Sequence, residues 1–298
     1  MENNRKPLKL ALTVVVFGLG AYLSSCKSSS DPINSEITQT VSNESAQDAQ
    51  QDEVDDISTG QLNSVDGANP RVATTSDDRV ACALITRDTT SDKTQGSITI
   101  NFDENSSGTA NASGCTDGRG NIRKGSITIT WSGGHWWKVG SVTTITMTNY
   151  SINGVVINGT RVLTNVSTDV STPAWTIVMT NATATWPDNS VATRSVAKTR
   201  TWNISEGTVT VTQTSAGTPS ASGTTRYGKS YTVQITVPLV YSAVCTFIDK
   251  VYIPVSGTKV ITIDTSKEIT IDYGNGSCNK SFTITFDGKT ETITASND

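Results

Sequence analysis

The sequence contains a single histidine, His135, and no CxxC pair, GxSxG motif or phosphate-binding glycine loop. Histidine is the side chain that most often transfers protons in active sites, and closely spaced cysteines are typical of zinc sites. The sequence also lacks the pattern of a Ser/His/Asp catalytic triad, and it has no paired carboxylates in a recognisable catalytic setting. We therefore expect no enzymatic activity, no cofactor and no metal ion. A hydrolase that uses only Asp and Glu is the one enzyme class left open.

Long apolar runs and clusters of positive charge are also missing. Lys and Arg are scattered along the chain, whereas nucleic-acid binding needs them clustered, so we expect no nucleic-acid partner. The only marked apolar run, 10–23, has 14 residues, and a helix needs about 20 to cross a bilayer. Because Arg5, Lys6 and Lys9 precede this run, residues 1–25 are predicted to be a secretory signal peptide.

The signal ends in Leu23-Ser24-Ser25-Cys26, which resembles the bacterial lipobox. This resemblance implies that Cys26 carries acyl chains that anchor the protein to a membrane. The alternative is an ordinary cleaved signal beside a chance cysteine. Lys27 stands where retention in the inner membrane would favour Asp, so we expect an outer-membrane lipoprotein, on the periplasmic face or the cell surface.

Residues 26–78 form a polar, acidic segment without aromatic side chains. Within 27–70, one Lys and nine acids give a net charge of 1 − 9 = −8. Low hydrophobicity with charge of one sign is typical of disorder. We therefore predict a disordered tether that would span roughly 40 Å as a flexible coil.

The remainder of the chain is predicted to be all-β. Thr, Val and Ile are abundant, and short runs alternate apolar with polar residues, which indicates strands with one buried face. We expect an antiparallel meander or sandwich of roughly a dozen or more strands. The predicted strands are 97–102, 126–131, 142–148, 155–166, 174–186, 208–214, 230–237, 246–253, 259–264, 268–273, 281–286 and 289–294.

Turn residues support short antiparallel connections. Asn153-Gly154 and Asp287-Gly288 accept the positive φ angles of a type I′ turn and predict two hairpins. Asn158-Gly159 follows too closely for another hairpin with a strand between. It therefore predicts a bulge or kink.

Two parts of the chain resemble each other in the order cysteine, strand, Gly-rich turn, cysteine, strand. We accordingly divide the folded part into a β-rich body, 79–240, and a C-terminal β unit, 241–298, that echoes 79–131. Generic strand similarity is the alternative to an internal duplication. Four cysteines allow three pairings, and the echo favours the two local ones, Cys82 with Cys115 and Cys245 with Cys278, each 33 residues apart.

The layout resembles a group of uncharacterised β-rich lipoproteins from Bacteroidetes over most of 80–295. The segments that carry the resemblance are ITINF at 98–102, CTDGRGNIRKG at 115–125, NYSING at 149–154, GTR at 159–161, Pro238-Leu239 and IDYGNGSC at 271–278. These motifs are Gly turns and strand starts. The resemblance implies a lipid-anchored β-rich protein and brings no activity with it.

The densest charged turn contains Arg119 and Arg123. It could hold an anion or a partner's carboxylate, and the plainer interpretation is a solvated hairpin tip.

The most unusual local feature is the loop of Trp131, His135, Trp136 and Trp137. Adjacent tryptophans cannot both point inward from a regular strand, so at least one should be exposed or cover a turn. An exposed Trp can stack on sugars or anchor a protein contact, whereas a cross-strand clamp of the hairpin is the structural alternative.

Taken together, these features predict a non-catalytic, membrane-anchored extracytoplasmic β-protein for adhesion, scaffolding or envelope structure. Its expected partners are the membrane, through Cys26, and a glycan or envelope protein. A carbohydrate-binding accessory lipoprotein that uses the Trp136/Trp137 loop is the alternative.

Overall fold

The computed structural model describes residues 35–66, 77–169, 171–205, 208–249 and 251–294. The predicted signal peptide and the lipidation site Cys26 lie outside these residues. So do 26–34 and 67–76 of the predicted tether.

The described residues form two helices and fifteen strands. The helices are α1 (Ser35–Asp66) and α2 (Ala243–Asp249). The strands are β1 (Leu84–Thr89), β2 (Gly96–Asn101), β3 (Cys115–Thr116), β4 (Ile122–Ser132), β5 (Val142–Ile152), β6 (Val155–Asn165), β7 (Ala174–Thr185), β8 (Val191–Ser205), β9 (Thr208–Ser215), β10 (Ala221–Thr224), β11 (Ser230–Ser242), β12 (Ser256–Ile263), β13 (Lys267–Asn275), β14 (Ser281–Phe286) and β15 (Lys289–Thr294).

All fifteen strands belong to one antiparallel sheet, which confirms the predicted fold class. Its order is β1-β2-β4-β5-β6-β7-β8-β10-β11-β12-β13-β14-β15, with β3 paired to β4, and with β9 paired to β8 and β11. Because β11 crosses the predicted boundary at residue 240 and pairs with β12, the body and the C-terminal unit share this sheet.

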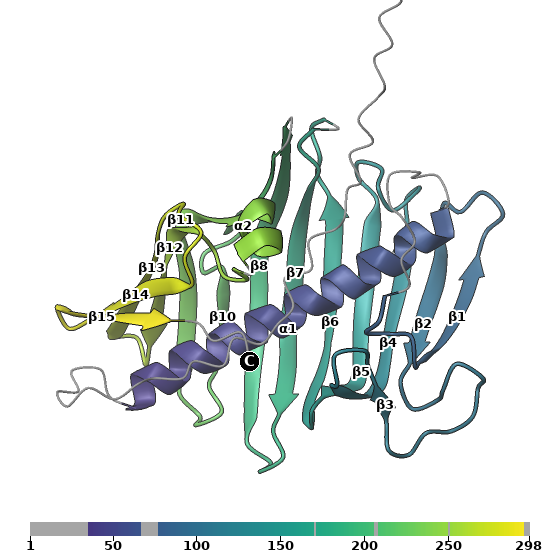
Figure 1. Cartoon of the computed structure of the whole chain (residues 1–298), viewed down its shortest axis with the longest axis horizontal. Helices are drawn as coiled ribbons and strands as arrows, with labels where there is room; N and C mark the ends of the chain where they lie inside the picture. Colours follow the sequence, from purple (N-terminus) through teal and green to yellow (C-terminus); the bar gives the residue numbers. More distant parts are fainter. Residues whose placement is uncertain (1–34, 67–76, 170, 206–207, 250, 295–298) are drawn as a thin grey trace, which may run out of the picture.

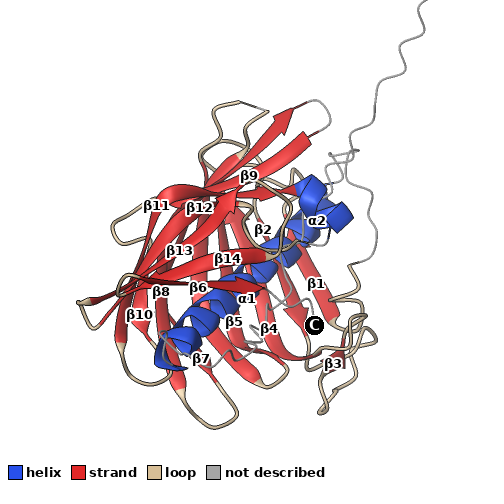
Figure 2. Ribbon diagram, turned by 60° about the vertical axis from the view of Figure 1, so that its left-hand side comes forward, coloured by secondary structure: helices blue, strands red, loops and turns tan. Residues whose placement is uncertain are grey.

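A row of bulges bends the sheet through four neighbouring strands. The pairing register shifts beside Gly125 in β4, Asn149 in β5, Gly159 in β6 and Asn181 in β7, all of which have positive φ. Each bulge adds a local bend and twist to its strand. The result is a curved sheet with a concave face (Figures 1 and 2).

Helix α1 lies diagonally across this concave face, from the side of β10 and β15 to the side of β1 and β2 (Figure 1). Its 32 residues make it about 48 Å long. All of residues 51–58 are buried, and Ile37, Val41, Val54, Ile57 and Leu62 join the core of the sheet. The predicted disorder is therefore wrong over Ser35–Asp66.

The segment was predicted to be disordered because it has too few apolar side chains for their burial to offset the entropy cost of ordering it. The sheet supplies buried positive charges as well, and these compensate the acidic side chains of α1. No helix of the described residues is long and apolar enough to cross a membrane.

Most predicted strands are present, with boundary shifts of a few residues, but four strands and both helices were missed. Strands β1, β3, β8 and β10 were not predicted. The predicted strand at 246–253 is wrong, because helix α2 ends only at Asp249. Branched and aromatic residues suggested a strand there, and the local alternation was too short to separate the two structures.

The local details of turns and cross-links agree with the sequence. Asn153-Gly154 and Asp287-Gly288 have positive φ and close the β5–β6 and β14–β15 hairpins. Disulfides join Cys82 to Cys115 and Cys245 to Cys278, with Cα–Cα distances of 5.5 and 5.0 Å. These features confirm the predicted hairpins and the local pairing.

The bulge at Gly125 gives a direct test of the bent sheet. Gly125 has φ +73°, and an added Cβ would collide with the backbone of Asn149 on β5, whereas Gly108 has φ +74° and open space around it. We expect Gly108→Ala to cost about 1 kcal/mol of strain and Gly125→Ala to cost roughly 1–3 kcal/mol more from overpacking. Denaturant unfolding of the two variants measures the difference, and equal losses would contradict the bulge geometry.

Candidate functional site

The concave face of the sheet is lined with buried positive charge. Every buried Lys or Arg of the described residues forms an ion pair with a carboxylate of α1. These side chains are Arg79, Arg123, Arg161, Arg194, Lys198, Arg200 and Lys259. We call this set the basic groove.

The acidic side chains of α1 repeat at helical spacing. Glu44, Asp48, Asp52 and Asp56 are each four residues apart, with Asp55 beside the last of them. Side chains at this spacing share one helix face, and each step of four residues advances about 6 Å along the axis. The helix thus carries a row of carboxylates that faces the cations of the sheet, and Glu53 adds one more.

The N-terminal part of α1 contacts β8 and β12. Arg194 of β8 donates to Glu44 at 3.0 Å and to Asp48 at 2.7 Å. Lys259 of β12 donates to Glu44 and lies 3.5 Å from Asp48. Two carboxylates therefore hold two cations from strands that are not adjacent in the sheet.

The middle of α1 lies over β6 and β8. Arg161 makes a bidentate pair with Asp55, in which Nε donates to Oδ1 at 2.7 Å and Nη2 to Oδ2 at 2.6 Å. Asp52 accepts from Lys198 at 3.1 Å and pairs with Arg200. Bidentate arginine pairs fix orientation as well as charge, so this contact sets the rotation of α1 about its axis.

The C-terminal part of α1 reaches the other edge of the groove. Arg123 of β4 pairs with Glu53 at 2.7 Å and with Asp117 at 2.8 Å. Arg79 pairs with Asp56 at 2.7 Å and with Asp77 at 2.6 Å. The ion pairs therefore continue from β12 to β4 and Arg79, over residues 44–56 of the helix.

These contacts and the burial of α1 shift the pKa values of its acidic side chains in opposite directions. Burial by itself would raise the pKa of Asp48, but the charges of Arg194, Lys198 and Lys259 bring that pKa well below its ordinary value. The pKa of Asp52 is also lowered, because Arg200 and Lys198 outweigh its burial. For Asp56, burial outweighs Arg79 and raises the pKa to about 6.

Because some of these pKa values are lowered and one is raised, we predict an unusual dependence of folding stability on pH. Asp48 and Asp52, with depressed folded pKa values, contribute stability above their unfolded pKa of about 3.9 that is lost as pH falls through the folded values. Asp56, with a raised pKa, favours folding progressively as pH falls from about 6. We expect equal or slightly higher unfolding midpoints at pH 5 than at pH 7, and a loss below about pH 3.5.

The variant Asp56→Asn separates these effects, because it removes the group with the raised pKa and leaves Asp48 and Asp52 in place. In this variant the unfolding midpoint should not rise between pH 7 and pH 5, and the loss of stability below about pH 3.5 should remain. Urea unfolding at pH 7, 5 and 3 measures both. A steady fall in stability from pH 7 to 5 in the unaltered protein would contradict the assignment.

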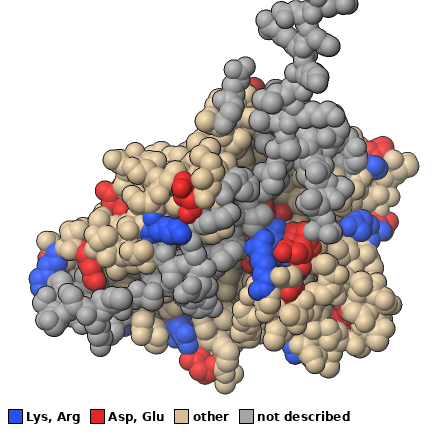
Figure 3. Space-filling model, in the orientation of Figure 1, with Lys and Arg blue, Asp and Glu red and all other residues tan. Residues whose placement is uncertain are grey.

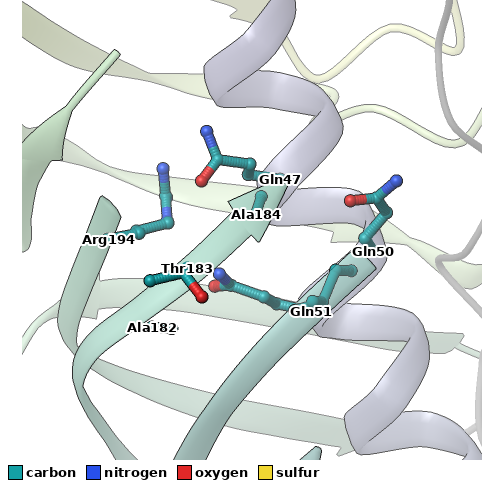
Figure 4. Close-up of a pocket in the computed structure, with 8 residues that line it drawn as sticks. Gln47, Gln50, Gln51, Ala182, Thr183, Ala184 and Arg194 are labelled. Atoms are coloured by element: carbon teal, nitrogen blue, oxygen red, sulfur yellow. The ribbon is translucent and has the colours of Figure 1, made fainter. Parts of the chain in front are cut away.

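Among the described residues, one small crevice lies between α1 and the sheet. This crevice between α1, β6, β7 and β8 is lined by Gln47, Gln50, Gln51, Ala182, Ala184 and Arg194, among others (Figure 4). It has room for about one water molecule. The groove is therefore filled by the helix, and its chemistry is the recognition of carboxylates.

The predicted aromatic loop separates into buried and exposed members. Trp131 is buried, and its indole donates to the carbonyl of Lys93 at 3.1 Å. Trp136 is partly buried and stacks on Trp175. Trp137 is 46% exposed and stacks on His135, with ring centroids 5.2 Å apart. As expected, one of the adjacent tryptophans faces outward, and Trp137 is the exposed aromatic side chain of this loop.

The charged turn also divides. Arg119 is exposed and lies 3.6 Å from Asp78. Arg123 is fully buried between Glu53 and Asp117 and also donates to Tyr150. The expectation of a ligand contact at a solvated tip is thus corrected for Arg123, because alternation along β4 turns its side chain into the groove.

Charged side chains are sparse on the face of the molecule that Figure 3 shows. Figure 3 shows Lys, Arg, Asp and Glu in small groups separated by larger uncharged areas. Cys245, Asp249 and Cys278 lie close enough together to suggest metal ligands, but the disulfide between Cys245 and Cys278 uses both sulfur atoms.

As a site residue, sequence reasoning singled out only Arg123 of the seven groove cations, and it missed the other six as well as their acidic partners on α1. Two signals were present. Arg194, Lys198 and Arg200 are separated by even numbers of residues, which places them on one face of a strand with Val196. The acids at 44, 48, 52 and 56 have the four-residue spacing of a helix face.

Comparisons with protein-family models, with curated proteins and with solved structures found no match to this chain. The resemblance to lipoproteins of Bacteroidetes stays a prediction.

Proposed function

We propose that the protein is a non-catalytic, membrane-anchored extracytoplasmic β-protein, whose folded part is a scaffold closed by its own acidic helix. The observation that carries this proposal is the basic groove. Each of its seven buried cations pairs with a carboxylate of α1. Groups that could transfer protons are thus held in structural ion pairs, which favours a structural or adhesive role.

Two features support the location and the anchor. Two disulfides are typical of exported proteins. If Cys26 is lipidated, only eight residues, 27–34, lie between the anchor and the start of α1 at Ser35, so the chain can extend at most about 30 Å there. A docked α1 would therefore hold the sheet closer to the membrane than a free tether of 52 residues could.

Fatty-acid labelling tests the anchor. Cells that express the full chain are grown with an alkyne-tagged palmitate, and the protein is isolated from the membrane fraction. We expect label on the unaltered protein and on Ser25→Ala, which keeps a small residue before the cysteine, and none on Cys26→Ser. Release of an unlabelled protein into the soluble fraction in all three cases would refute the anchor.

A second candidate function is carbohydrate binding, which the exposed Trp137 on its stacked His135 favours. Flat aromatic faces at the surface suit sugar rings. A glycan array with the unaltered protein, Trp137→Ala and Trp131→Phe tests it. We expect binding to be lost in Trp137→Ala and kept in Trp131→Phe, which changes a buried ring. Absence of glycan binding, or equal binding by all three proteins, would reject this candidate.

A further inference from the structure

We propose that the basic groove is a receptor for an acidic α-helix supplied in trans, and that its occupant is α1 of a second copy of this chain. Reciprocal exchange of α1 would then join two copies. This inference does not depend on the lipid anchor or on the scaffold role, because it concerns only the groove and the helix that fills it.

The first argument is charge complementarity. Residues 35–66 contain eight acids and no Lys or Arg, and the side chains that face them include the seven buried cations of the groove, six from the sheet and Arg79 from the turn before β1. Without a carboxylate partner, those cations would be buried and unpaired, which is strongly unfavourable. The groove is therefore most stable with an anionic occupant.

The second argument is spacing, which selects a helix over an extended polyanion. Contacts to Glu44, Asp48, Asp52 and Asp55 follow one another at intervals of four and three residues. Only an α-helix puts side chains with these intervals on one face, with a rise of about 6 Å for each four residues. The bidentate Arg161–Asp55 pair adds an orientation that a flexible polyanion would not reproduce.

The third argument is that α1 can leave without breaking the sheet. Among the described residues, no backbone hydrogen bond joins α1 to a strand. The contacts are made by side chains, and the chain returns to the body through residues 67–76. An α1 from a second copy would remake the same ion pairs and apolar contacts as the chain's own α1. The balance between the monomer and the exchanged dimer is therefore set by protein concentration.

The groove is tested with the chain from residue 27 onward, carrying a protease site inserted after residue 70. Cleavage in the folded protein leaves α1 held only by the groove. A fluorescent peptide of residues 35–66 is then added and its binding followed by anisotropy. The matched control peptide exchanges the positions of Glu44 with Ser45, Asp48 with Ala49 and Gln51 with Asp52, so that composition and net charge are unchanged.

We expect the native peptide to replace cleaved α1, and to bind roughly tenfold more weakly in 0.5 M than in 0.05 M salt, because salt screens the attraction between the acidic peptide and the basic groove while the two are apart. The exchanged control peptide should bind at least roughly tenfold more weakly than the native one, because its carboxylates miss the cations. Equal binding of the two peptides, or no replacement of cleaved α1 by the native peptide, would overturn the receptor.

The occupant is tested on uncut chains. Isotopically heavy and light proteins are mixed over a range of concentrations up to about 1 mM, where linked segments of this size compete with their intramolecular counterparts. Native mass spectrometry should show heavy–light dimers that increase with concentration and disappear when excess peptide 35–66 is added. Absence of mixed dimers, or dimers that the peptide leaves unchanged, would overturn a second copy as the occupant.

Discussion

Arg161→Met is expected to lower the free energy of unfolding by about 3–5 kcal/mol, because it leaves a buried carboxylate without its main partner. Asp55 and Arg161 are both almost completely buried and share two hydrogen bonds. Arg200 lies 3.8 Å from Asp55, which is too far to replace a bidentate pair. Chemical denaturation followed by far-ultraviolet circular dichroism measures the loss.

Two further variants separate the ion pair from the burial of its members. Asp55→Leu/Arg161→Met removes both charges, and it should recover to within about 1 kcal/mol of the unaltered protein, since apolar replacement of a buried pair is often neutral. Arg119→Met breaks an exposed pair with Asp78 and should cost at most about 1 kcal/mol. A loss in Arg161→Met no larger than that of Arg119→Met would show that α1 is not held by this contact.

Removal of the Cys82–Cys115 disulfide should produce the second large effect. The bond closes a loop with a sequence separation of 33, and the chain-entropy model gives about 4 kcal/mol for a loop of this length. Cys82 follows Arg79, and Cys115 precedes Asp117, so the bond also positions two side chains at the end of the groove. The variant Cys82→Ala/Cys115→Ala should lose this stability in denaturant unfolding.

The second disulfide supplies a matched control. Cys245 and Cys278 have the same separation of 33, so the chain-entropy contribution is the same. Cys245 lies in α2, whereas Cys82 is three residues from Arg79, which pairs with Asp56 of α1. Only the Cys82/Cys115 variant should therefore speed proteolysis within the C-terminal part of α1. Equal proteolysis in both variants would contradict a link between that disulfide and the groove.

Sequence patterns predicted the sheet because its determinants are local. Alternation in 97–102 or 281–286 reflects one buried face, and Asn153-Gly154 or Asp287-Gly288 adopts the turn that its own backbone favours. Even the bulge at Asn158-Gly159 was predictable from the position of its glycine. The disulfide pairing was predictable because each bond joins two cysteines within one copy of the repeated cysteine–strand pattern, only 33 residues apart.

The groove was not predicted because its determinants are far apart in the chain. Glu44 meets Lys259 across 215 residues, and Asp55 meets Arg161 across 106. Taken alone, residues 27–70 have the charge and polarity of a disordered segment, and Arg161 or Lys198 is an ordinary solvated strand position. The acids of α1 and the cations of the basic groove can be buried only when they pair with each other. Local sequence patterns do not show which distant residues will pair.

Hydrogen–deuterium exchange of the backbone amides in residues 51–58 tests the docked helix most directly. All of these residues are buried, so their amides should exchange over hours at neutral pH, as slowly as those of β4 to β8, and faster after Arg161→Met. Complete exchange within seconds, as in an unstructured peptide, would contradict an acidic helix held in a basic groove.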